Sequence, residues 1–129
     1  MSSKARELSE LADTITVDGS GNFAFNSGYG SVATAYGCRA WVNWNGNSGS
    51  ISGSGNVSSV TRTSTGAYDI NFATNMPDTN YAVACCSGEA RVDRGLSSNG
   101  LATNKLAMVY KSTAGSFADG NPLMVVVMR

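Results

Sequence analysis

The sequence contains no histidine, which removes the side chain that most often serves as a general base or a metal ligand. A Ser-His-Asp triad and a Cys-His pair are therefore impossible, and no Cys-x-x-Cys pair is present to bind zinc. The sequence also lacks the glycine motifs that bind phosphates and dinucleotides. We expect a protein that is not an enzyme and that uses no metal and no cofactor.

Charge is scarce: nine basic and nine acidic residues give a net charge of zero. Nucleic-acid-binding proteins usually carry an excess of basic residues that neutralises phosphates, so we expect no nucleic-acid partner. No apolar run approaches the ~20 residues that cross a bilayer, and no signal peptide is visible, so we expect no membrane insertion. A surface with so few charges repels its own copies weakly, which suits a subunit that assembles.

Cysteine is also rare, and its pattern does not favour disulfides. The count is odd, and Cys85 and Cys86 are adjacent, so that on a strand they would point to opposite faces. We expect these two residues and Cys38 to be small buried thiols. Such a protein can fold in a reducing cytoplasm.

Paired carboxylates that could cleave glycosidic bonds are not suitably spaced. Glu89 and Asp93 are four residues apart, so on a straight strand their side chains share a face roughly 13 Å apart. Glycosidases place their two carboxyl groups about 5–9.5 Å apart. With Arg91 between them, the segment predicts an exposed ladder of ion pairs.

The first 13 residues predict an N-terminal helix. Strong helix formers follow a possible serine N-cap, and Ala5, Leu8 and Leu11 recur at helical spacing to form one narrow apolar stripe. Because so short a helix is marginal in water, it must pack on its own domain, on symmetry mates or on another protein. We favour a role in attachment or trimer assembly over a simple lid on the core.

From residue 14 to residue 129, short apolar alternations are separated by glycine, serine and asparagine, which is typical of strands joined by turns. About nine strands in this order predict an antiparallel β-sandwich domain over 14–129. The expected strands cover 14–17, 23–25, 31–36, 39–45, 57–63, 67–72, 81–86, 106–110 and 123–128.

Several segments of this domain carry more specific expectations. The strand 39–45 has Trp41 on one face and Trp44 on the other, which favours a core on one side and a neighbouring protomer on the other. The glycine-rich segment 46–55 predicts a loop or an irregular strand. Residues 95–104 predict a polar loop. The apolar run 123–128 predicts a strand buried on both faces.

Two aromatic residues lie in glycine- and serine-rich loops, where packing explains an aromatic side chain less easily. These are Tyr29 and Phe117. A flat ring can cover the apolar face of a sugar, so both are candidates for contact with a receptor or a glycan.

The sequence also resembles a module that recurs in tail-fibre and related virion proteins of tailed bacteriophages, especially marine and cyanobacterial phages. The motifs that carry the resemblance stand in the order of that module over most of residues 1–86. They are Ser3–Leu8, Gly37–Gly46, Asn56–Thr61, Gly66–Phe72 and Met76–Tyr81. The segment 46–55 is richer in glycine and serine than the module's usual strand, which leaves a short fibre, a tail-tip knob and a capsid decoration protein open.

The resemblance implies a phage virion structural protein, assembled in the host cytoplasm, as a tail fibre or tail-tip knob that contributes to host-surface attachment. It implies a homotrimer that contacts other virion proteins and a glycan or protein of the host surface. The alternative is a capsid decoration or head-fibre protein that stabilises the particle. A lectin-like module outside any virion is a third interpretation.

Overall fold

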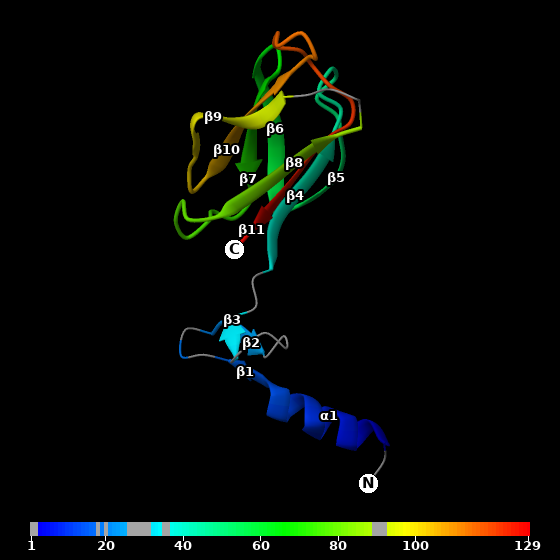
Figure 1. Cartoon of the computed structure of the whole chain (residues 1–129), viewed down its shortest axis with the longest axis vertical. Helices are drawn as coiled ribbons and strands as arrows, with labels where there is room; N and C mark the ends of the chain where they lie inside the picture. The colour runs from blue at the N-terminus through cyan, green and yellow to red at the C-terminus, as the bar shows by residue number, and fades with distance from the viewer. Residues whose placement is uncertain (1–2, 18, 20, 26–31, 35–36, 89–92) are drawn as a thin grey trace. The chain divides into compact units, whose positions relative to one another are not determined.

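A computed structural model of the chain describes residues 3–17, 19, 21–25, 32–34, 37–88 and 93–129 (Figure 1). The chain divides into two compact units between Gly37 and Cys38. Unit 1 holds a helix and a small three-stranded sheet, and unit 2 holds two four-stranded sheets. Every strand pair among the described residues is antiparallel, which confirms the prediction of an antiparallel β-sandwich preceded by a short N-terminal helix.

Unit 1 begins with the predicted helix and continues into three very short strands. Its elements are α1 (Ser3–Thr14), β1 (Ile15–Val17), β2 (Phe23–Phe25) and β3 (Ala33–Thr34), with the strands in the order β1-β2-β3. The sequence placed the start of the sandwich at residue 14. Among the described residues, however, these strands pair only with one another, so the sandwich unit starts at Cys38. Within the described part of the chain, no helix is long and apolar enough to span a membrane.

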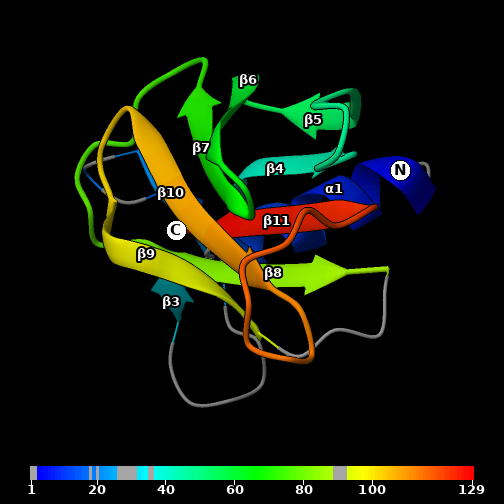
Figure 2. The same ribbon diagram turned by 90° about the horizontal axis from the view of Figure 1, so that it is seen from above.

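Unit 2 is built from eight strands in two sheets that face each other (Figure 2). In chain order the strands are β4 (Cys38–Trp44), β5 (Ile51–Gly55), β6 (Val57–Ser64), β7 (Ala67–Phe72), β8 (Ala82–Ser87), β9 (Asp93–Leu101), β10 (Lys105–Lys111) and β11 (Leu123–Met128). We call the sheet ordered β5-β4-β11-β8 the β11 sheet, and the sheet ordered β6-β7-β10-β9 the β10 sheet.

Alternate residues of the inner strands fill the core between the two sheets. The alternation of β4 separates Trp41 from Trp44, and the structure places the Trp44 face inward: Ala40, Val42 and Trp44 are each at most 2% exposed. Trp44 meets Tyr68 edge to face, with ring centroids 5.6 Å apart. Complete burial of a large apolar side chain contributes roughly 1.5–3 kcal/mol, so this layer stabilises the domain. The fully buried side chains are Val42, Trp44, Tyr68, Ile70, Leu106, Met108, Tyr110, Leu123, Val125 and Val127.

The predicted polar loop over 95–104 is wrong for most of its length, because residues up to Leu101 belong to strand β9. This strand forms an edge of the β10 sheet, and its pairing with β10 shifts between Leu106 and Met108. An edge strand pairs with only one neighbouring strand, and its other edge is exposed to water. It therefore tolerates a polar composition from which the sequence pattern alone predicts a loop.

Burial on both faces of β11 is also wrong for the single chain. The strand is central, as expected, but only Leu123, Val125 and Val127 are buried, while Val126 and Met128 are 38% and 39% exposed. The cysteine prediction fails in a similar way. Cys38 and Cys86 are exposed, Cys86 on the outer side of β8, while Cys85 is half-buried and packs against the core.

The glycine-rich segment is explained by Trp41. Strand β5 pairs with β4 so that Gly55 lies opposite Trp41 and Gly53 opposite Asn43. A Cβ atom at Gly55 would lie 2.4 Å from Nε1 of the indole, and one at Gly53 would lie 3.1 Å from its Cη2. The indole therefore lies across both glycines, where an aromatic ring covers backbone that no side chain protects.

Because the strands alternate in direction, the connections of unit 2 gather at two ends. One end holds Cys38, Arg129 and the loop 73–81, and it includes the β5–β6 corner at Asn56, whose φ is 53°. The Asn56 side chain donates to the Arg39 carbonyl over 3.2 Å and accepts from the Thr74 amide over 2.7 Å. The opposite end, which we call the loop end, holds the connections 45–50, 65–66 and 112–122.

Candidate functional site

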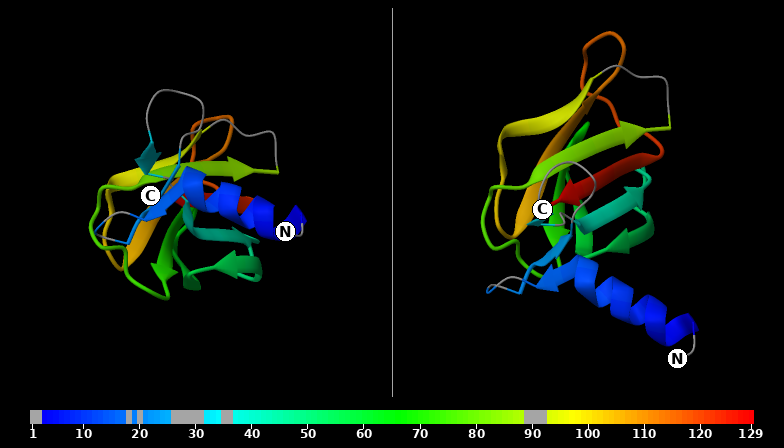
Figure 3. Two further views of the ribbon diagram at one scale, coloured as in Figure 1. Left: turned by 90° about the horizontal axis from the view of Figure 1, so that it is seen from below. Right: turned by 60° about the horizontal axis from the view of Figure 1, so that its bottom comes forward.

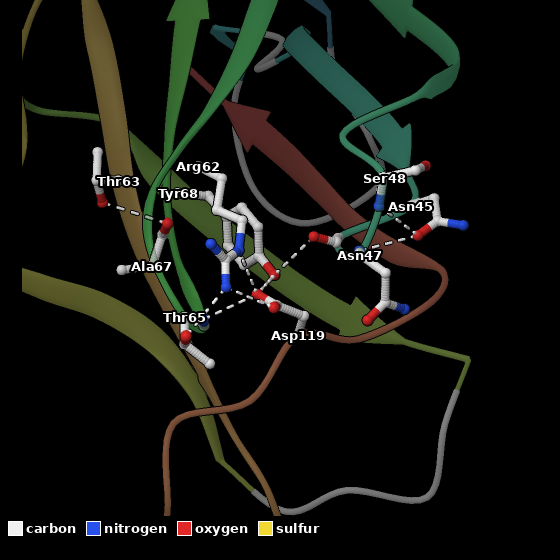
Figure 4. Close-up of polar contacts among 11 residues, drawn as sticks. Asn45, Asn47, Ser48, Arg62, Thr63, Thr65, Ala67, Tyr68 and Asp119 are labelled. Atoms are coloured by element: carbon white, nitrogen blue, oxygen red, sulfur yellow. Dashed lines mark hydrogen bonds and ion pairs between the residues drawn. The ribbon is translucent and has the colours of Figure 1, made fainter.

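The loop end is fastened by a single carboxylate, that of Asp119, on the long connection between β10 and β11 (Figure 4). Its two oxygens accept from Nε and Nη2 of Arg62 over 2.9 Å and 2.8 Å, which is a bidentate ion pair. The same carboxylate accepts from the Gly66 amide over 3.0 Å and from the Tyr68 hydroxyl over 2.6 Å. One side chain thus ties the 112–122 loop to the β6–β7 hairpin.

The charge states of this cluster follow from its contacts. The hydrogen bonds from Arg62 hold the pKa of Asp119 well below its usual range. Burial, followed by the hydrogen bond to Asp119, raises the pKa of Tyr68 well above its ordinary value. At neutral pH the cluster therefore holds an ionised carboxylate, a cationic guanidinium and a neutral phenol that donates its only proton.

This arrangement holds the loop in place and offers little to a reaction. Four donors occupy the Asp119 carboxylate, so it has little capacity left to accept a proton or bind a cation. Among the described residues no group of three Cys, Asp or Glu side chains could hold a metal ion. We infer that Asp119 positions the loops around it.

Phe117, one of the two aromatic candidates, lies on the loop that Asp119 fastens. The loop turns tightly: the Gly115 amide donates to the Ser112 carbonyl over 2.9 Å, and the Ser112 amide donates to the Ser116 carbonyl over 2.8 Å. Phe117 then forms a backbone bridge to Lys111. Its ring is 54% exposed, with the Lys111 ammonium 5.2 Å from its centroid.

An exposed aromatic ring beside an ammonium group can contact a polar ligand in two ways. The ring can cover the C–H groups of a sugar, and the ammonium can donate to hydroxyl or carboxylate oxygens. Residues 112–117 are held by their own turn and by Asp119 nearby, so little conformational entropy is lost when a ligand binds.

The other predicted site residues belong to unit 1 or lie outside the described residues. Tyr29 is outside them, so its role in ligand contact stays a prediction. Leu8, in α1, is 68% exposed and Ala5 is exposed, while of Leu11 only its place in the helix is described. The ion-pair ladder predicted around Glu89 and Arg91 also lies outside the described residues.

Sequence reasoning missed Arg62 and Asp119, which are 57 positions apart. No spacing rule relates a strand arginine to an aspartate on a distant loop. The local sequence Asp119-Gly120 indicates only a turn. Detecting the pair would have required the pairing of β7 with β10, which brings their segments together.

No family model matches the sequence, and neither a curated protein nor a solved structure is significantly similar to it.

Proposed function

We propose that this chain is a non-enzymatic structural protein of a bacteriophage virion, a tail fibre or tail-tip knob that assembles through unit 1 and contributes to host-surface attachment. The sequence resemblance supplies the class of protein. The observation that carries the proposal is the amount of apolar surface on unit 1.

Unit 1 exposes more apolar surface than so small a unit can leave in water. Its exposed large side chains are Leu8 at 68%, Val17 at 66%, Phe23 at 52%, Val32 at 51% and Phe25 at 41%. A unit of about 40 residues rarely folds stably without disulfides, metals or association. With no metal group among the described residues and with Cys38 the first cysteine of the chain, association is the remaining route.

Unit 2 has two distinct ends, which fits attachment at one end and ligand contact at the other. The chain enters the sandwich at Cys38 and leaves it at Arg129, both at the end opposite the loop end. Phe117 and Lys111 lie at the loop end, opposite the end of the sandwich that contains Cys38. Such loops on a rigid scaffold commonly carry binding functions.

We further propose a homotrimer, which the resemblance to fibre modules implies. Closed rotational symmetry lets identical apolar surfaces bury one another without leaving an open edge. Other virion proteins then contact the assembled unit 1 in the particle.

The assembly role of α1 predicts that Leu8→Asp combined with Leu11→Asp abolishes incorporation into phage particles. The substitutions remove the apolar side chains that the helix would bury, and burying the new carboxylates would cost much free energy. Purified particles probed by immunoblot measure incorporation, and circular dichroism of the isolated protein checks that the sandwich still folds. Ser9→Asp, which places one negative charge elsewhere on the exposed helix, is the control and should incorporate normally. Normal incorporation of the double variant would contradict the role of α1.

The recognition role of the loop end predicts that Phe117→Ala reduces binding of the isolated protein to host-surface glycans about two- to twelvefold, because a stacked ring contributes roughly 0.5–1.5 kcal/mol. A glycan array, followed by titration of the best ligand, measures the loss. Thr113→Ala, at an exposed position of the same loop, is the matched control and should bind as the wild type does. Equal binding by both variants would remove Phe117 from the contact surface.

The position on the virion is tested by electron microscopy of intact particles labelled with an antibody against this chain. Label at the tail tip or fibres supports host attachment. Label over the head contradicts a tail location and indicates a decoration or head-fibre protein that stabilises the particle.

A further inference from the structure

The two outer faces of the sandwich differ sharply in chemistry. The outer face of the β10 sheet is an ordinary wet surface: Lys105 and Asp69 form an ion pair at 2.7 Å. On the same face Asn71 donates to the hydroxyls of Ser59 and Thr61 over 3.0 Å and 3.2 Å. The composition of this face is the reference for a surface of this chain that stays in contact with water.

The outer face of the β11 sheet has a different composition, which follows from the strand register. Across β8, β11 and β4, Ala84 lies opposite Val126, which lies opposite Trp41. In the next row Cys86 lies opposite Met124, which lies opposite Asn43, and towards the chain ends Ala82 lies opposite Met128. None of these residues is charged.

Large apolar side chains on this face remain accessible in the single chain. Trp41 is 43% exposed, Met128 39% and Val126 38%, and the neighbouring Ala82, Ala84 and Cys86 are exposed as well. The right-hand view of Figure 3 shows β11 (red) between β8 (yellow-green) and β4 (teal). Contiguous apolar surface that spans several strands usually marks an interaction site.

We propose that the outer face of the β11 sheet is the surface on which a second copy of this chain packs. The charge pattern favours a copy of the same chain. In a symmetric interface side chains near the axis meet their own counterparts, so a charged residue there would face a like charge. The rows at Trp41 and Asn43 carry none, and the nearest charged side chain of β4 is Arg39, towards its end.

The small residues of the face make close packing possible. Gly53 and Gly55 leave the Trp41 indole without competing side chains, and Ala82 and Ala84 let a facing sheet approach. A polar ligand such as a glycan would need several hydrogen-bond partners, and in these rows the side chains offer only the Asn43 amide, the Cys86 thiol and the Trp41 indole N–H. The composition therefore fits an apolar partner better than a sugar.

The outer face of the β11 sheet is about half the size of a standard protein interface, so a stable assembly needs a second contact surface as well. Four strands about 4.8 Å apart and about six residues long, at roughly 3.3 Å each, give a flat area of about 400 Å². A standard interface buries about 800 Å² of accessible surface on each partner. The apolar side chains that unit 1 exposes supply the remainder in the same assembly. The inference rests on the proposed self-assembly and is independent of the position in the virion.

The test compares the full-length wild type with Val126→Lys and Val109→Lys. Val126 and Val109 are β-branched residues on the outer sides of interior strands, β11 and β10 respectively, so both variants lose the same strand propensity. Light scattering coupled to size-exclusion chromatography gives the mass. We expect a multiple of 13.3 kDa for the wild type and Val109→Lys, and a fall to the single-chain mass for Val126→Lys.

A second readout uses the native thiol of Cys86, which lies on the same face. A short pulse of a thiol reagent, read by peptide mass spectrometry, should modify Cys86 slowly in the wild type and rapidly in Val126→Lys. Circular dichroism checks folding. If Val126→Lys does not fold, Ala84→Arg on the exposed edge strand β8 replaces it, with the same expectations.

Three results would overturn the inference. They are a monomeric wild type, an oligomer that survives Val126→Lys or Ala84→Arg, and a Cys86 that reacts equally fast in wild type and variant. If the wild type is monomeric and Cys86 still reacts slowly, another part of the same chain covers the outer face of the β11 sheet. Because none of these measurements uses virions, failure of the virion location and failure of the self-contact are distinguished.

Discussion

Replacing Gly66 by alanine is expected to destabilise the sandwich by about 3–5 kcal/mol, as a combined strain and clash at one turn. Its φ of +66° lies in the left-handed region, which costs other residues roughly 1–2 kcal/mol. An added Cβ would also lie 2.4 Å from the Tyr110 carbonyl oxygen and 2.7 Å from that of Ala118, which are backbone atoms. The turn cannot shift freely, because the Tyr110 amide donates to the Gly66 carbonyl over 2.7 Å. Urea unfolding followed by fluorescence of the buried Trp44 measures the loss.

Gly115→Ala is the matched control for this experiment. Gly115 has a φ of +77°, but no atom lies within 4 Å of the position of its Cβ. This variant should lose only the conformational part, about 1–2 kcal/mol. Equal losses at the two positions would show that the backbone clash at Gly66 contributes nothing.

Asp119→Ala is expected to destabilise the sandwich by about 2–4 kcal/mol, because it leaves several donors without an acceptor. The Gly66 amide is buried and loses its partner, and the buried Tyr68 hydroxyl keeps only a 3.3 Å contact to the Gly46 carbonyl. Arg62 loses both bonds of its ion pair. Urea unfolding at pH 7 measures the change. Asp69→Ala removes an ion pair with Lys105 that is similarly exposed but has a single bond, and it should cost only about 0–1 kcal/mol.

The same substitution should alter the acid sensitivity of the protein. The pKa of Asp119 is lowered by its hydrogen bonds to Arg62, so the folded state binds the proton less readily than the unfolded state does. The stabilisation is therefore fully present above the ordinary carboxylate pKa of 3.8 and is lost as the pH falls towards the lowered value. Asp119→Ala should unfold with a smaller loss of stability below that pH. If wild type and Asp119→Ala lose stability equally as the pH falls below 3.8, the ionised Asp119 carboxylate does not stabilise the folded state.

Local patterns were sufficient where one short segment decides its own conformation. The α1 helix, the strands β6 and β7, and the placement of Trp41 and Trp44 on opposite faces of β4 were predicted because helical spacing and strand alternation are properties of neighbouring residues. These predictions needed no knowledge of which strands pair.

Local patterns failed where a distant partner decides the outcome. The polar segment of β9 became a strand because β10 offers it a pairing edge. For the glycine-rich segment, pairing with β4 decided between the two predicted alternatives in favour of the irregular strand β5. The Asp119 cluster depends on residues more than 50 positions apart. Periodicity carries no information about such contacts.

The sequence by itself determined the all-β class, the N-terminal helix and the absence of histidine-dependent chemistry. The tertiary structure decided that unit 1 includes its own small sheet, that the outer face of β11 remains apolar and accessible, and that Asp119 fastens the loop bearing Phe117. The physical reason is range. Backbone preferences act over a few residues, whereas burial, sheet pairing and buried ion pairs depend on segments that meet only when the whole domain has folded.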